Sequence, residues 1–193
     1  MQIDLNKMIS PVEGADRITW AEVEALRARG EAIHADLRAR RKRGDLPFHD
    51  LPYQDVTPVL TYAEQARSRF ENFVVVGIGG SALGNIALQT SLRHPHHNLL
   101  PKARRGGPRM FFPDNIDPDL VGGLFDAIDP AETLFNVITK SGSTAETMSA
   151  FLLVRQALID AVGDRWREHV VVTTDPEKGD LRQIAREEKL TAF

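Results

Sequence analysis

Two stretches of this sequence combine glycines with hydroxyl side chains, a combination that suits anion binding. Residues 74–84 read VVVGIGGSALG, where an apolar run enters three glycines and a serine. Residues 138–147 read ITKSGSTAET and hold five hydroxyl side chains, one lysine and one glycine. Glycine permits a tight turn and a close approach of the backbone to a ligand, and the free N–H groups at a helix start attract negative charge. Both stretches are therefore candidate phosphate sites.

The second stretch carries the stronger signal because its polar side chains converge on one predicted helix start. Lys140 adds positive charge and Gly142 allows the turn. Ser143 and Glu146 have the spacing of a capping box, which would engage one hydroxyl with the helix itself. Phosphate needs several short donors at a helix dipole, and a capping serine accounts for only one of the five hydroxyls here. The predicted hydroxyl donors to phosphate are Thr139, Ser141, Ser143, Thr144 and Thr147.

The first stretch fits two kinds of phosphate loop. Gly77, Gly79 and Gly80 allow a turn with positive φ, and Ser81 stands where a helix N-cap is expected. Gly77, Gly79 and Ala82 also match the dinucleotide fingerprint G-x-G-x-x-G/A. The acidic residue that should hold a ribose about 20 positions later is missing, since that region reads PKARRGG, whose arginines would suit only a 2′-phosphate. The fingerprint also leaves the second stretch unexplained, so we favour phosphate over a dinucleotide and expect no cofactor.

One histidine-rich segment carries a weaker signal. His94, His96 and His97 resemble a metal-binding tract, but Pro95 breaks helical ligand spacing and no carboxylate is adjacent. We interpret this segment as a solvated loop and expect no metal site. No Ser–His–Asp set and no pair of catalytic carboxylates can be assigned from sequence distance alone.

Four apolar runs are predicted to be the strands that position these stretches. Each is followed by a helical pattern, and four such repeats describe a parallel, doubly wound sheet with helices on its faces. The runs are almost continuously apolar, which is typical of strands covered on both sides. The predicted strands are residues 73–78, 109–115, 134–140 and 169–175, and the helices that follow them are 82–92, 118–128, 144–162 and 180–189. Asp117, directly before Pro118, is the expected N-cap of the second of these helices.

The N-terminal part is predicted to be helical. Residues 19–42 follow a helical apolar face and open with Thr19 and Glu22 as a capping box. Their basic end, RARRKRG, suits a solvated helix C-terminus better than a nucleic-acid surface. A proline-punctuated linker at 46–55 then leads to a second helix at 59–73.

Length and composition indicate a globular protein whose partner is a small molecule or another protein. The net charge is −3 with interspersed charges, and no run approaches the ~18 apolar residues of a membrane span, so we expect neither nucleic-acid nor membrane binding. The absence of cysteine fits a reducing cytosol, and we expect a cytoplasmic location. The 193 residues suit a helical extension and linker at 1–57 followed by one domain at 58–193.

The last residues, KLTAF at 189–193, look like the opening of a further strand. We therefore expect the sequence to be the front part of a longer protein. The alternative is a complete small domain whose last strand is a short edge strand.

The two anion-binding stretches, taken together, resemble the bacterial type of the glucose-6-phosphate isomerase family, and TTDPEKGDLRQIAREE at 173–188 is similar to that family's next strand and helix. The resemblance covers essentially the whole chain. It implies a sugar isomerase (SIS) domain, a flavodoxin-like three-layer α/β/α sandwich, of which the family carries two. It also implies isomerisation of glucose 6-phosphate to fructose 6-phosphate through an enediol. The residues that it places on the substrate are Gly80 and Ser81, and those on its phosphate are Thr139, Lys140, Ser141, Gly142, Ser143 and Thr144.

The sequence departs from the family pattern in its catalytic groups. In the family, a glutamate base, an arginine, and a histidine and lysine for ring opening follow a GGRFS-like stretch, and no residue here matches them. We therefore expect a phosphate-binding portion, without a second SIS domain, that is inactive alone because proton transfer needs a base at the sugar carbons. Its expected partners are a hexose 6-phosphate and either a second copy of the chain or a complementing C-terminal half. The alternative from another class is a stand-alone SIS module that binds a sugar phosphate as a sensor or regulatory subunit.

Overall fold

The computed structural model describes residue 4, residues 8–10 and residues 18–193. The chain forms two units, Met1–Asp55 and Val56–Phe193. In the first unit a short parallel strand pair precedes two helices. Its elements are β1 (Ile9–Ser10), β2 (Ile18–Thr19), α1 (Trp20–Ala25), α2 (Arg27–Lys42) and the 3₁₀ turns η1 (Pro47–His49) and η2 (Leu51–Tyr53).

The N-terminal helix starts as predicted but is not continuous. Thr19 is the N-cap of α1, and a capping box joins it to Glu22, whose N–H donates to the Thr19 hydroxyl over 3.3 Å. The prediction of one helix over 19–42 is wrong at Leu26, which separates α1 from α2. The Leu26 N–H donates to the Val23 carbonyl as in a 3₁₀ turn. Neither helix has a buried residue, so tertiary packing does not stabilise one continuous helix across Leu26.

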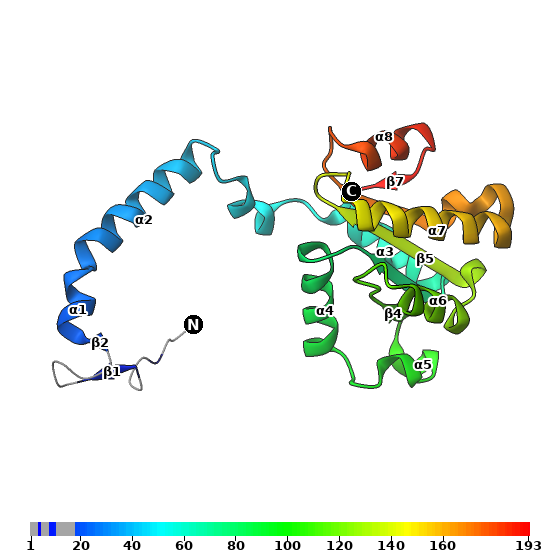
Figure 1. Cartoon of the computed structure of the whole chain (residues 1–193), viewed down its shortest axis with the longest axis horizontal. Coiled ribbons are helices and arrows are strands. Elements are labelled where there is room, and N and C mark those ends of the chain that lie inside the picture. The colour runs from blue at the N-terminus through cyan, green and yellow to red at the C-terminus, as the bar shows by residue number, and fades with distance from the viewer. Residues whose placement is uncertain (1–3, 5–7, 11–17) are drawn as a thin grey trace. The chain divides into compact units, whose positions relative to one another are not determined.

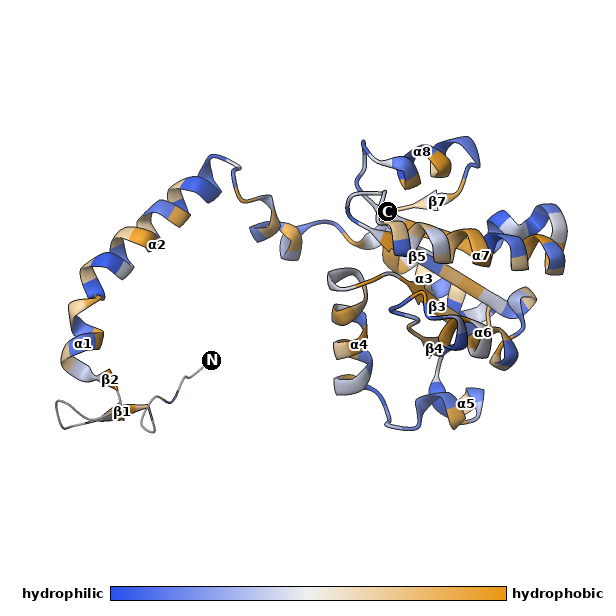
Figure 2. Ribbon diagram, in the orientation of Figure 1, coloured by the Kyte–Doolittle hydropathy of each residue, from blue (hydrophilic) through white to orange (hydrophobic). Residues whose placement is uncertain are grey.

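The apolar face predicted for α2 is exposed to solvent. Ile33 is 51% exposed and Leu37 is 40% exposed, and Figure 2 shows α2 as largely hydrophilic with isolated hydrophobic residues. The basic end of the helix is paired with carboxylates, since Arg41 and Arg43 each lie 2.9 Å from Asp50 and Asp45, respectively. Across the part of the chain that the structure describes, no helix is long and apolar enough to cross a bilayer.

The second unit is built on a five-stranded parallel sheet, which confirms the predicted sheet type. The strands are β3 (Asn72–Val76), β4 (Arg109–Phe111), β5 (Thr133–Thr139), β6 (Val170–Thr174) and β7 (Thr191–Ala192). Their order across the sheet is β4-β3-β5-β6-β7, so the strand predicted at KLTAF forms as β7. This is the flavodoxin-like order, in which the direction of progression reverses between β3 and β5.

The helices of this unit agree with the predicted segments, with differences at the boundaries. Between residues 93 and 108, where no helix is predicted, the chain forms a 3₁₀ turn and a short helix. The helix predicted to run to residue 73 ends at Arg69, because Phe70 is extended and β3 begins two residues later. The elements are α3 (Thr57–Arg69), α4 (Gly80–Leu92), η3 (His97–Leu99), α5 (Lys102–Arg105), α6 (Pro118–Ala127), η4 (Pro130–Glu132), α7 (Ala145–Val162), η5 (Gly163–His169) and α8 (Asp180–Glu187).

Successive side chains of each strand point to opposite faces of the sheet. Helices pack on both faces, which gives the predicted three layers of helix, sheet and helix. On one face, α6, α7 and α8 bury the main core against the valines and Phe135 of the central strands; Figure 1 shows α7 lying across β5. On the other face, α3 packs on a smaller cluster that contains Phe70, Leu134 and Val171. The two glycine-containing stretches lie at the carboxyl ends of β3 and β5.

Candidate phosphate site

The two candidate phosphate-binding stretches lie side by side at the point where the strand order reverses. In the register of the sheet, Val76 of β3 pairs with Val137 of β5. β3 ends at Val76 and β5 at Thr139, so the carboxyl ends of the two strands lie side by side. β3 leads into the N-terminus of α4, and β5 leads into the N-terminus of α7. Ligands of open α/β sheets bind outside the carboxyl ends of the strands at such a reversal. The topology therefore brings the two predicted regions to one place.

The turn between β3 and α4 depends on glycine at two positions. A Cβ on Gly77 would lie 2.9 Å from the Ser81 Cβ and 3.1 Å from the Ile138 carbonyl oxygen, so only glycine lets β5 approach this closely. Gly79 has φ +55 and is the N-cap of α4. The prediction that Ser81 is the N-cap is wrong, because the helix begins at Gly80 and places Ser81 in its first turn.

The Ser81 hydroxyl is the group that this turn offers to a ligand. The backbone N–H of Ser81 donates to the Ile78 carbonyl and that of Ala82 to the Gly79 carbonyl, so both are engaged within the turn. The hydroxyl of half-buried Ser81 makes no hydrogen bond within the described residues. Gly80 precedes it as the first residue of α4.

Three hydroxyls at the end of β5 form a compact cluster. The Oγ1 atoms of Thr139 and Thr144 are 2.9 Å apart, and the Oγ of Ser141 lies 3.5 Å from the first and 3.4 Å from the second. Thr139 is buried at the end of the strand, whereas Ser141 is exposed and Thr144 is half-buried. Hydroxyls can turn their protons toward an incoming anion, so this cluster can present several donors to one phosphate.

The start of α7 leaves its first N–H groups without a side-chain cap. Its N-cap is Thr144, whose side chain makes no capping hydrogen bond. The capping box expected between Ser143 and Glu146 is not formed; the Ser143 N–H donates instead to the Ser141 Oγ over 3.3 Å. The first turn of an 18-residue helix thus faces the hydroxyl cluster with its positive dipole end available to an anion.

Of the other predicted site residues, Lys140 and Ser143 belong to the same turn as the three clustered hydroxyls, and Thr147 lies outside the cluster. Lys140 and Ser143 are exposed, and Lys140 has no ion pair within the described chain. Thr147 is buried, 3% exposed, and its Oγ1 has no hydrogen-bond partner among the residues that the structure describes. Thr147 lines a small hollow together with Gly77 and Glu146, rather than joining the three clustered hydroxyls.

The turn at Gly142 is held by a residue that the sequence prediction missed. A Cβ on Gly179 would lie 2.4 Å from the Ser141 carbonyl oxygen, and a Cβ on Gly142 would lie 2.8 Å from the Gly179 Cα. Both glycines have positive φ, +74 for Gly142 and +97 for Gly179. The Leu181 N–H donates to the Gly142 carbonyl over 2.9 Å, so the start of α8 supports the hydroxyl turn. The sequence signal for this residue is a glycine directly before the helix predicted at 180–189.

The end of β6 also supports the cluster. The Thr174 hydroxyl donates to the Thr139 carbonyl over 2.7 Å. The Asp175 carboxylate accepts the N–H groups of Glu177 and Lys178 at 2.8 and 2.9 Å, and these bonds lower the pKa of Asp175 below its ordinary value. This fixes the turn that carries Gly179 toward the hydroxyl cluster.

The histidine-rich segment is structural in the described part of the chain. His97 is buried, and its Nε2 lies 3.1 Å from the Pro108 carbonyl oxygen, while the His94 Nδ1 accepts the His96 N–H. The expectation of a solvated loop is therefore wrong for His97. No group of three potential ligands among the described residues is arranged to hold a metal ion.

Comparisons with known proteins agree on one family. A family model described as phosphoglucose isomerase matches residues 60–189. A glucose-6-phosphate isomerase from Carboxydothermus hydrogenoformans is 41% identical over 196 residues, which is 100% of this chain and 42% of the relative. Another from Rubrobacter xylanophilus is 54% identical over 136 residues, 69% of this chain and 31% of the relative. A crystal structure of a hypothetical protein from Thermus thermophilus matches with a TM-score of 0.70 and 38% identity, covering 88% of this chain and 40% of that one. The chain thus spans less than half the length of these relatives.

Proposed function

Because this chain belongs to the phosphoglucose isomerase family, we propose that it is the phosphate-binding part of a glucose-6-phosphate isomerase. The observation that carries the proposal is the triangle of hydroxyls at the uncapped start of α7, beside the glycine turn of α4. Such a site combines short-armed donors with a helix dipole, as phosphate requires. The proposed phosphate ligands are Thr139, Lys140, Ser141, Gly142, Ser143, Thr144 and Thr147, and the proposed sugar contacts are Gly80 and Ser81.

The proposed site contributes binding and orientation to aldose–ketose isomerisation. A phosphate held at α7 fixes one end of the hexose, and the neighbouring turn at Ser81 then meets the sugar. Binding energy from a non-reacting phosphate serves the reaction only when a catalytic base acts at the sugar carbons. We assign no such base to this chain. The names of the relatives favour an isomerase over a stand-alone sugar-phosphate sensor.

The proposal includes the organisation and partners of the chain. Residues 58–193 are proposed as the sugar-phosphate-binding domain and 1–57 as its helical extension. The ligand is a hexose 6-phosphate, and the protein partner is a second copy of the chain or a complementing C-terminal half. The proposed location is the cytoplasm.

Calorimetric titration with glucose 6-phosphate tests the site. The double substitution Ser141→Ala and Thr144→Ala should weaken binding, because each lost charge-assisted hydrogen bond is worth ~1.5–3 kcal/mol. Ser149→Ala is the matched control, since Ser149 is exposed on the same helix outside the cluster. Unchanged affinity in the double variant would overturn the proposed phosphate site.

An isomerase assay tests the assignment of the base. The 193-residue chain should bind glucose 6-phosphate but form no fructose 6-phosphate above the buffer rate. Turnover by the purified chain, abolished by Ser141→Ala with Thr144→Ala, would show that a base is present and would contradict the proposal.

A further inference from the structure

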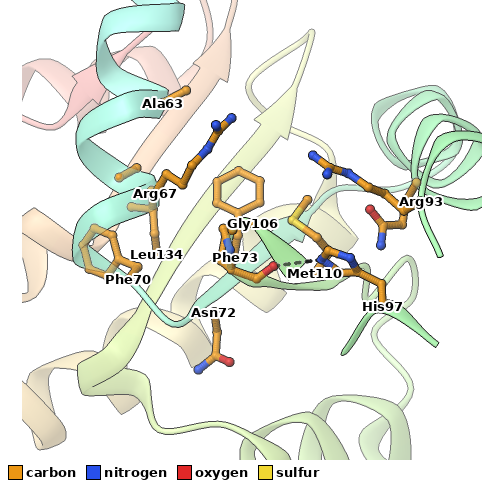
Figure 3. A pocket seen from close by; sticks show the side chains of 14 residues that line it. Ala63, Arg67, Phe70, Asn72, Phe73, Arg93, His97, Gly106, Met110 and Leu134 are labelled. Carbon is orange, nitrogen blue, oxygen red and sulfur yellow. Dashed lines mark hydrogen bonds between the residues drawn. The ribbon is translucent and has the colours of Figure 1, made fainter. Parts of the chain in front are cut away.

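A separate pocket of about 220 Å³ opens between α3 and α4, on the face of the sheet opposite α7. Its floor is apolar and consists of Phe73, Met110 and Leu134 from three neighbouring strands. Ala63 of α3 forms one wall (Figure 3), and Ala66 of the same helix also lines the pocket. None of its lining residues belongs to the proposed phosphate site. The pocket includes Asn72, the first residue of β3, so it lies toward the amino ends of the strands, whereas the proposed phosphate site lies at their carboxyl ends.

Two guanidinium groups border this apolar floor. Arg67 comes from α3 and Arg93 follows the end of α4; Figure 3 shows their side chains approaching the pocket from opposite sides. Arg93 has no carboxylate partner within the described residues. Arg67 makes an exposed contact of 3.9 Å with Glu64, which contributes little. Among the described residues none that lines the pocket is acidic, so its positive charge is not balanced locally.

The floor and far wall are held in place by hydrogen bonds. The Asn98 side chain donates to the Met110 carbonyl and accepts the Met110 N–H, both over 2.8 Å. His97 lines the pocket and contacts the Pro108 carbonyl. Asn72 is fully buried and donates to the Thr133 hydroxyl over 3.1 Å. A pocket with fixed walls avoids part of the ordering cost of binding.

We propose that this pocket binds a small amphipathic anion, with a ring-sized apolar group on Phe73 and Met110 and one anionic head between Arg67 and Arg93. The apolar floor provides burial for the body of the ligand. Arginine forms paired hydrogen bonds with carboxylate and related oxyanions, and the two unbalanced guanidinium groups select negative charge. The inference is independent of the sugar-phosphate site and extends the function beyond isomerisation.

Methionine-methyl NMR on the full 193-residue chain tests the proposal with 3-phenylpropanoate as the probe. Met110 lines the pocket, whereas Met148 packs against the core on the opposite face and serves as the internal control. The Met110 methyl signal should shift saturably, with a Kd on the order of 1 mM for a ligand of this size, while the Met148 signal stays in place. Neutral 3-phenylpropan-1-ol should bind at least about tenfold more weakly, because it lacks the anion.

Exposed-residue variants locate the binding. Arg93→Gln and Arg67→Gln should each weaken the probe about tenfold, and Arg165→Gln, an exposed arginine on η5 outside the pocket, should leave its Kd unchanged. Ala63→Phe on the exposed side of α3 should fill the pocket and abolish the Met110 shift. Circular dichroism confirms that each variant is folded.

Three results would overturn the proposal. They are a Met110 signal that does not move at about 20 mM probe, well above the expected Kd; equal affinity for acid and alcohol; and binding that survives Ala63→Phe in a folded protein. Ser141→Ala with Thr144→Ala separates this site from the proposed phosphate site, since that variant should not affect the Met110 shift.

Discussion

At the residue scale, the turn that carries the hydroxyl cluster depends on two glycines whose backbones are in contact. Gly142 and Gly179 both have positive φ, and neither has space for a Cβ. The contact places the residues before α8 directly beneath Ser141. Gly179 therefore acts as a positioning residue for the hydroxyl cluster, without offering the ligand any group of its own.

Gly179→Ala should weaken glucose 6-phosphate binding as well as stability. The added Cβ would lie 2.4 Å from the Ser141 carbonyl oxygen, so the hydroxyl turn must move. Gly163→Ala is the matched control, because Gly163 also has positive φ, +60, but open space around its Cβ position. Both variants should lose ~1–3 kcal/mol of stability to backbone strain, with the larger loss in Gly179→Ala because its Cβ also clashes. Only Gly179→Ala should lose affinity in calorimetry. Equal affinities in the two variants would contradict the positioning role.

His169 makes the stability of the second unit sensitive to mild acid. Its side chain is buried with Nδ1 3.0 Å from the Thr133 carbonyl oxygen. Burial lowers the pKa of His169 below 6.5, although that hydrogen bond opposes the shift. As the pH decreases below 6.5, the unfolded chain takes up a proton before the folded chain does, so the free energy of unfolding decreases.

Urea unfolding at about pH 7.5 and about pH 5.5 measures this effect. His169→Gln should reduce the loss of stability between the two pH values, because glutamine keeps a donor for Thr133 but does not titrate. His96→Gln, at an exposed position, should leave the loss unchanged. An undiminished pH dependence in His169→Gln would assign the acid sensitivity to other groups.

Sequence alone could predict which hydroxyl side chains belong to the candidate site, but not which groups they form hydrogen bonds with. Thr139, Ser141 and Thr144 were predicted donors, and the structure brings them together. The positions of Thr147 and Gly179 depend on how α7 and α8 pack on the sheet, which no local pattern encodes. The predicted capping box at Ser143 failed for a related reason, since the Ser141 hydroxyl is close enough to accept the Ser143 N–H.

At the scale of elements, helix starts differ in whether a side chain caps them. The Asp117 carboxylate accepts the Leu120 N–H over 3.0 Å and caps α6, as predicted. α4 and α7, whose N-termini lie at the candidate site, have no side-chain cap within the described chain. An uncapped start costs stability. At α7 it leaves N–H groups available for a ligand, whereas at α4 the N–H groups of Ser81 and Ala82 donate to carbonyls of the turn.

Asp117→Ala should lower the free energy of unfolding by ~1 kcal/mol, because an N-cap carboxylate is replaced by a residue that cannot accept the Leu120 N–H. Asp126→Ala, an exposed position in the last turn of the same helix, is the control and should not destabilise the protein. Urea unfolding at neutral pH measures both. A loss in Asp126→Ala equal to that in Asp117→Ala would show that general charge removal, and not capping, is responsible.

The hydrophobic pattern of the sequence was sufficient to predict the parallel sheet and its main helices. Strand runs such as FVVVGI are apolar enough to be recognised, and each is followed by a longer helical pattern. The break at Leu26 and the short α5 were not predictable, because both lie in largely exposed segments where a few local hydrogen bonds decide the conformation.

At the scale of the whole molecule, large apolar side chains remain exposed along α4. Leu88 and Leu92 are 61% and 74% exposed and lie one helical turn apart. These two side chains form an exposed apolar surface that favours association.

Sedimentation velocity should therefore show concentration-dependent association of the 193-residue chain. Leu88→Lys with Leu92→Lys should shift the chain toward monomer, since charge at these positions disfavours burial. Gln65→Lys with Ser68→Lys, at exposed positions on α3, controls for added charge. A chain that is monomeric at all concentrations would contradict the prediction.

The strand order also determines when the sheet can assemble on the ribosome. Asn72 at the start of β3 contacts Arg109, 37 residues later, and Thr133, 61 residues later. At 5–20 residues per second, synthesis of that second interval takes about 3–12 s. During this time the valines of β3 have emerged without their β5 partner, which is the condition under which aggregation competes with folding. The strand order that brings the two candidate phosphate-binding stretches together thus also prolongs the time for which the nascent chain is open to aggregation.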